Sequence, residues 1–173
     1  TQERISPSTR RIRGAGDVCM YLVEGTEKVA LIDTGYGVGD LKGYTETLTD
    51  KPLVVLITHG HLDHVGGAGQ FEQVYMSHAD IALAQEHSDL EKRKQAICHG
   101  DAQACATVTP ADFIPPFTGE FLPLQDGQMF DLGGVTLKLL ALRGHTNGIM
   151  TVLNVQDRTI MFGDACGVGV LLC

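Results

Sequence analysis

One short segment, THGHLDHVGG at 58–67, constrains this chain more than any other feature. It places three of the seven histidines directly after the apolar run LVVLI, which is typical of a strand covered on both faces. Histidine is the commonest side-chain metal ligand, and residues two apart in extended backbone project to the same side. His59 and His61 can therefore reach one ion, while Asp63 and His64, where the chain turns, could serve a neighbouring ion.

Composition limits the class of protein. With 173 residues, 43% hydrophobic and 20% charged, residues 1–173 are expected to form a single globular domain. No apolar run approaches the roughly 18 residues that cross a bilayer, so no membrane association is expected. A net charge of -8 disfavours nucleic-acid binding, which uses basic surfaces. The five cysteines are odd in number and irregularly spaced, which favours reduced thiols and a cytoplasmic location.

Hydrophobic periodicity predicts a mixed α/β chain. Strands are expected over 18–24, 28–33, 53–57 and 74–77, and helices over 38–48 and 79–96. Periodicity is lost over 97–125, which indicates a functional loop or disorder. Three strand-like runs follow, VTLKLLALRGHT, IMTVLNV and TIMFGDA. Helices packed on the outer faces of two stacked sheets would satisfy this order of elements.

Four motifs in one order give the sequence a family resemblance. ALIDTG at 30–35, the H-x-H-x-D-H segment, GHTNG at 144–148 and FGDA at 162–165 together resemble the metallo-β-lactamase superfamily. The resemblance runs from about Met20 to Asp164. It implies an αββα sandwich with metal ligands on loops at one edge of the sheets.

The resemblance also implies the role of each polar residue. His59, His61 and His145 would hold a first metal, Asp63 and His64 a second, and Asp164 would bridge the two. Asp33 would help to orient the metal-binding loop, with a turn cap as the alternative. Imidazole and carboxylate donors favour two Zn²⁺ ions, although Fe or Mn would accept the same set.

Two adjacent cations can lower the pKa of a shared water and polarise a carbonyl oxygen. We therefore expect a metal-dependent hydrolase of a small ester, thioester or lactone, acting through a metal-bridging hydroxide. Asp63 would orient the nucleophile and help to receive its proton. The alternatives are β-lactamase activity, or a non-catalytic binding or scaffold protein with an incomplete second site. The expected partner is a small-molecule substrate, and homo-oligomer formation is left open.

The sequence departs from the family pattern near its end. The family takes its last second-site ligand from a histidine downstream of the bridging aspartate, and no histidine follows His145. We therefore expect that the C-terminal portion of the domain is missing. Completion by another chain, or a second site with one ligand fewer, are the alternatives. Cys166 could reach the metals or be a buried structural thiol, and the phenylalanines of 97–125 could line the pocket or pack elsewhere.

Overall fold

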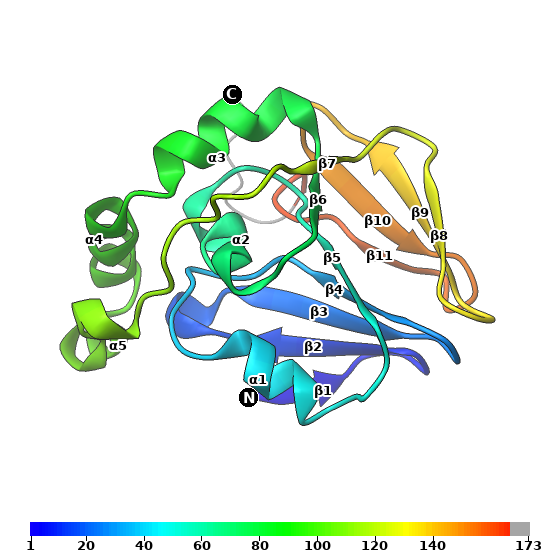
Figure 1. The fold of residues 1–173 in the computed structure, drawn as a ribbon, viewed down its shortest axis with the longest axis horizontal. Helices are drawn as coiled ribbons and strands as arrows, with labels where there is room; N and C mark the ends of the chain where they lie inside the picture. The colour runs from blue at the N-terminus through cyan, green and yellow to red at the C-terminus, as the bar shows by residue number, and fades with distance from the viewer. Residues whose placement is uncertain (167–173) are drawn as a thin grey trace.

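Two β-sheets stack face to face in the computed structural model, which describes residues 1–166 (Figure 1). The larger sheet contains, in spatial order, β1 (Gln2–Arg4), β2 (Thr9–Arg13), β3 (Cys19–Glu24), β4 (Val29–Ile32), β5 (Leu53–Leu56), β6 (Val74–Met76) and β7 (Leu122–Pro123). The smaller sheet has the order β11-β10-β9-β8 and contains β8 (Met129–Asp131), β9 (Thr136–Ala141), β10 (Met150–Asn154) and β11 (Thr159–Met161). The predicted pair of stacked sheets is confirmed.

Short helices accompany the larger sheet. They are α1 (Leu41–Glu46), α2 (Leu62–Val65), α3 (Ile81–His87), α4 (Leu90–Gly100) and α5 (Ala102–Thr107), with 3₁₀ turns η1 (Ala15–Asp17), η2 (Ala68–Gln70), η3 (His78–Asp80) and η4 (Pro110–Asp112). In Figure 1, α1, α2, α4 and α5 lie on the side of the larger sheet, and α3 lies along its upper edge. Within residues 1–166, no helix covers the outer face of the smaller sheet.

The larger sheet is buried on both faces at β4, as its apolar run predicts. All four residues of β4 are buried, and they alternate between two cores. One core lies between the sheets and includes Ala30, Ile32, Leu56, Leu137, Leu139 and Val152. The other lies under the helices and includes Leu22, Leu31, Val55, Val65, Ala84 and Phe121. These two cores fix the register of β4 and β5, and so fix where the following loops begin.

Strand direction determines where the polar segments gather. β4, β5 and β6 are parallel neighbours, so their carboxyl ends meet at one edge of the sheet. Asp33 directly follows β4, the H-x-H-x-D-H segment follows β5, and Asp80 ends the η3 turn after β6. This edge therefore collects ionisable side chains from three consecutive crossovers.

Several expectations about elements were wrong. The first strand was expected over 18–24, but β1 and β2 precede it, and β2 pairs with β3. The helix expected over 79–96 is two helices, α3 and α4, and the segment 97–125 contains the end of α4, all of α5 and β7. None of the helices among the described residues is long and apolar enough to cross a membrane.

The cysteine expectation was wrong in part. Cys98 of α4 and Cys105 of α5 form a disulfide that links the two helices, with their Cα atoms 4.5 Å apart. Cys19 and Cys166 are free thiols, as expected. Cys173 lies outside the described residues.

Candidate metal centre

All six predicted ligands converge at the edge where the two sheets meet. Four of them follow β5 of the larger sheet: His59 and His61 lie in the loop after this strand, and Asp63 and His64 lie in α2. The other two follow strands of the smaller sheet, His145 after β9 and Asp164 after β11. Two groups have ligand atoms that all lie within 4.8 Å of one another: His59, His61 and His145, and His59, His64 and Asp164. Segments separated by about a hundred positions in sequence are thus brought to one place.

The first group has a geometry that fits a metal ion. Nδ1 of His61 lies 3.1 Å from Nε2 of His59 and 2.8 Å from Nε2 of His145. A ring nitrogen carries either one hydrogen or one lone pair, so Nδ1 of His61 can make only one good hydrogen bond to these neighbours. A cation between the three rings would satisfy all of them. Tetrahedral zinc places its ligand nitrogens about 3.3 Å apart, which is close to the observed separations.

The protonation states of His59 and His61 suit metal binding. Burial and the neighbouring imidazoles lower the pKa of His59, which is almost fully enclosed. The pKa of His61 is lowered by burial and by His145 and His87. Both rings are therefore neutral near pH 7, and only a neutral imidazole has a lone pair for a metal.

Asp164 lies close to histidines of both groups. Its Oδ1 is 3.3 Å from Nε2 of His64, and its Oδ2 is 3.5 Å from Nε2 of His145. The hydrogen bond from His64 lowers the pKa of Asp164, whereas burial opposes that shift. Asp63 Oδ2 lies 3.6 Å from Nε2 of His64. Carboxylate oxygens thus lie beside ring nitrogens from both groups.

Asp33 is hydrogen-bonded to the H-x-H-x-D-H segment that follows β5. It accepts hydrogen bonds from the backbone N–H of Thr58 at 2.7 Å and from the Thr58 hydroxyl at 2.8 Å. Its Oδ2 is also 2.8 Å from Nδ1 of His64. Burial would lower the pKa of His64, but Asp33 and the carboxylates of Asp164 and Asp63 raise it well above the ordinary value. Because Asp33 binds Nδ1, the Nε2 atom of His64 faces Asp63 and Asp164.

Two cavities lie beside these residues. One of about 590 Å³ opens against His61 and His145, and its other walls include Ala82 and Leu83 at the start of α3. The second, of about 460 Å³, is lined by Asp63, His64 and Asp164 among others. Either is large enough for part of a small substrate.

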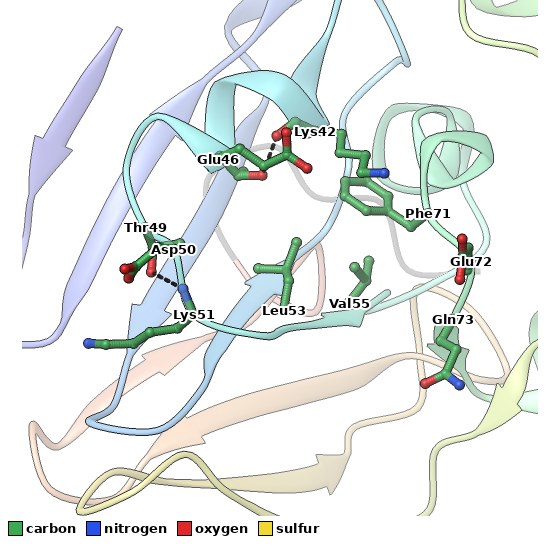
Figure 2. Close-up of a pocket in the computed structure, with 11 residues that line it drawn as sticks. Lys42, Glu46, Thr49, Asp50, Lys51, Leu53, Val55, Phe71, Glu72 and Gln73 are labelled. Atoms are coloured by element: carbon green, nitrogen blue, oxygen red, sulfur yellow. Dashed lines mark hydrogen bonds between the residues drawn. The ribbon is translucent and has the colours of Figure 1, made fainter.

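A further cavity, of about 530 Å³, lies elsewhere, between α1 and β5 (Figure 2). Figure 2 shows Lys42 and Glu46 of α1 above Leu53 and Val55, with Phe71 at one side. None of its lining residues belongs to the histidine and aspartate cluster. Its charges are of both signs, so we assign it no role.

The structure settles two alternatives of the sequence analysis. Cys166 is exposed and lines the cavity beside Asp164, so it is not a buried structural thiol. Phe113 and Phe121 are each 8% exposed, and Phe117 packs against Phe121 with ring centroids 4.8 Å apart. These rings pack inside the fold rather than line the cavities beside the histidines.

Two residues near the cluster were given no role in the sequence analysis. His87 of α3 stacks on His61, with ring centroids 5.1 Å apart and an angle of 19° between the planes. Asp80 is 1% exposed and touches both histidine loops. The only signal for Asp80 in the sequence was its place shortly after the predicted strand 74–77, at the same edge as Asp33.

Two relatives of known name match most of this chain. The chain is 30% identical over 188 aligned positions to the human acyl-coenzyme A thioesterase MBLAC2, covering 99% of this chain and 64% of that protein. It is 30% identical to the hydroxyacylglutathione hydrolase GloC of Haemophilus influenzae, covering 84% of this chain and 65% of that protein. The chain thus spans a little under two thirds of the length of these relatives.

A solved structure and a sequence profile give the same result. TTHA1623, solved in a di-iron-bound form, superposes with a TM-score of 0.66 at 26% identity, covering 94% of this chain and 75% of that one. A profile of the metallo-beta-lactamase superfamily matches residues 13–170. The chain therefore has the fold of the metallo-beta-lactamase superfamily and belongs to that superfamily.

Proposed function

We propose that this chain carries the metal centre of a metal-dependent hydrolase that cleaves a small thioester. The observation that supports it best is the convergence of three histidine nitrogens on one point, with Nδ1 of His61 at 3.1 and 2.8 Å from its two neighbours. Hydrogen bonds alone do not satisfy that arrangement, whereas a bound cation does.

The proposed ligand sets follow the sequence prediction. His59, His61 and His145 would hold the first ion, Asp63 and His64 the second, and Asp164 would contact both. Two bound ions would supply Lewis acidity at the substrate carbonyl and lower the pKa of a water molecule toward neutrality. Nitrogen and carboxylate donors favour zinc, with iron and manganese as the alternatives.

Two residues of the chain would assist the reaction: Asp63 would transfer protons, and Asp33 would orient His64. Asp63 is 27% exposed and next to His64, so it can reach both water and a bound substrate. In the proposed reaction a water oxygen bonds to the carbonyl carbon and the carbon–sulfur bond breaks. Asp63 takes the proton from the water and returns it to the leaving thiolate, so that an acid and a thiol are formed. Asp33 keeps Nε2 of His64 directed at the site throughout.

A thioester is favoured within the predicted group of esters, thioesters and lactones. One relative is named as an acyl-coenzyme A thioesterase and another as a hydroxyacylglutathione hydrolase, so acyl groups carried on thiols recur among the matched proteins. The cavity beside His61 and His145 has apolar wall residues, Ala79, Ala82 and Leu83, that could contact an acyl group. The cavity and the histidines together therefore suit an acyl thioester.

The test is reconstitution of the metal-free chain. Chelator-treated protein would be loaded with zinc, ferrous iron or manganese and assayed with a short acyl-coenzyme A, by trapping the released thiol with a chromogenic disulfide. The matching oxygen ester, a lactone and a chromogenic cephalosporin would be assayed in parallel. We expect about two equivalents of bound metal and thioester cleavage that chelator abolishes.

Other outcomes separate the alternatives. Faster turnover of the cephalosporin than of the thioester would favour β-lactamase activity. A folded chain that binds about two metal ions and cleaves none of the four substrates would contradict the hydrolase proposal. A folded chain that binds no metal would favour a scaffold protein.

A further inference from the structure

Asp80 is a buried carboxylate that the proposed reaction does not use. It ends the η3 turn just after β6 and is 1% exposed. Removing a carboxylate from water is costly unless hydrogen bonds replace the lost hydration. Within residues 1–166 no lysine, arginine or histidine forms an ion pair with it, so backbone and hydroxyl donors must stabilise it.

Those donors come from the two loops that carry the histidine ligands. Oδ2 of Asp80 accepts from the backbone N–H of Gly60 at 3.1 Å and from the hydroxyl of Thr146 at 2.7 Å. Oδ1 accepts from the backbone N–H of Gly148 at 2.7 Å. Gly60 lies between His59 and His61, and Thr146 directly follows His145. One side chain therefore joins the loop after β5 to the loop after β9.

Both loops approach Asp80 so closely that only glycine fits. A Cβ atom on Gly148 would lie 2.7 Å from Cγ of Asp80, and one on Gly60 would lie 2.8 Å from the Asp80 carbonyl oxygen. Real Cβ contacts are longer than these distances. The close approach to Asp80 therefore explains why glycine occupies positions 60 and 148.

We infer that Asp80 is a positioning residue that sets the distance between the His59–His61 loop and His145, and so sets the metal affinity of that three-histidine group. This inference rests on the proposed metal centre. Asp80 acts on the opposite side of β5 from Asp33, because β6 and β4 flank β5. Asp33 contacts Thr58 and His64, whereas Asp80 contacts the backbone and hydroxyl groups beside the other three histidines.

The test is zinc affinity in Asp80→Asn, measured by competition with a chromophoric chelator. Asparagine has the same shape but only one acceptor oxygen, so at least one N–H donor of Gly60 or Gly148 would face an NH₂ group. We expect zinc affinity to fall by about tenfold to hundredfold, the usual effect of losing a residue that orients metal ligands. Circular dichroism would establish that the variant is folded.

Two further variants keep the inference testable if Asp80→Asn does not fold. Thr146→Val removes one hydroxyl donor and should reduce zinc affinity by about fivefold. Thr146→Ser keeps the hydroxyl and should restore the parent affinity, which loss of packing alone would not predict. Asp157→Asn is the matched control, since Asp157 also accepts three hydrogen bonds, from Ser6 and Ser8, far from the histidines.

The outcomes distinguish this inference from the proposed function. If the parent chain binds zinc and folded Asp80→Asn and Thr146→Val bind it equally well, the positioning role is wrong and the metal centre stands. If Asp157→Asn weakens zinc binding as much as Asp80→Asn does, the effect is general destabilisation and the inference is also wrong. If the folded parent chain binds no zinc, both proposals fail.

Discussion

Oδ2 of Asp33 lies 2.8 Å from Nδ1 of His64, and this contact directs Nε2 of His64 toward Asp63 and Asp164. A histidine that ligates metal through one ring nitrogen usually donates the other N–H to a carboxylate or carbonyl. The proposed second metal site therefore depends on a residue that is not itself a ligand. Asp33 has a φ of 63°, a conformation that asparagine and aspartate tolerate better than most residues.

The Asp33→Asn variant tests this dependence with little backbone strain. The amide has one acceptor oxygen for three donors, so either the Thr58 N–H or the His64 N–H would face an NH₂ group. We expect zinc affinity to fall about tenfold to hundredfold. Chelator competition measures the loss, with Asp157→Asn as the control. Unchanged affinity in a folded variant would show that Asp33 serves only as a turn cap.

Asp63→Asn tests the proposed proton transfer. Loss of a general base typically reduces turnover by about 10²- to 10⁴-fold, and the part-exposed position of Asp63 predicts little effect on the fold. The kcat for thioester cleavage should fall by that amount, while the thermal midpoint of the metal-free protein stays unchanged. Glu72→Gln removes the same charge at an exposed position and should retain turnover. A kcat equal to that of the parent would remove Asp63 from the mechanism.

Part of the histidine and aspartate cluster could be predicted from sequence because its signal is local. H-x-H-x-D-H lies within six consecutive residues after an apolar strand, and the buried runs of β4 and β5 are equally plain. Asp80 is different, because its hydrogen-bond partners are Gly60, Thr146 and Gly148, which are 20 to 68 residues away. No local pattern distinguishes such a carboxylate from an ordinary helix cap.

The elements that were not correctly predicted from sequence, β2, α4 and α5, have little apolar periodicity. In β2 only Thr9 and Ile12 are buried, and arginines fill the other positions. α4 buries only Arg93 and Ile97, and α5 buries none of its residues, so neither produces an apolar stripe. Capping was the available signal, since Asp101 accepts from the backbone N–H groups that begin α5.

The Cys98–Cys105 disulfide should stabilise the α4–α5 pair without affecting the metal centre. The cysteines are seven residues apart, and closing so short a loop restricts the unfolded chain by about 2 to 3 kcal/mol. Reduction, or the double change of Cys98 and Cys105 to serine, should therefore lower the free energy of unfolding by up to that amount. Urea denaturation measures it, and hydrogen exchange should increase in α4 and α5.

Zinc affinity should be unchanged in the reduced protein, because no proposed ligand lies on α4 or α5. Cys19→Ser is the control for the loss of a thiol that forms no disulfide. An unfolding free energy that does not respond to reduction would show that the disulfide contributes nothing to stability.

Asp157 should make stability depend on acid pH. It joins the N-terminal hairpin to the β10–β11 turn by accepting from Ser6 Oγ at 2.6 Å, Ser8 N at 2.8 Å and Ser8 Oγ at 2.7 Å. Burial tends to raise the pKa of Asp157, but these hydrogen bonds outweigh it and lower the pKa below its ordinary value. A carboxyl group with a lower pKa in the folded state stabilises the fold above its unfolded pKa of about 3.9.

That contribution is lost as the pH falls through the folded pKa of Asp157. The difference in unfolding free energy between the parent and Asp157→Asn should therefore be constant from about pH 7 to pH 5 and should shrink below about pH 4. Urea denaturation with chelator present throughout keeps metal release from contributing. Asp50→Asn removes the same charge at an exposed position and is the matched control. A difference between parent and Asp157→Asn that stays constant down to about pH 2 would contradict the role assigned to these hydrogen bonds.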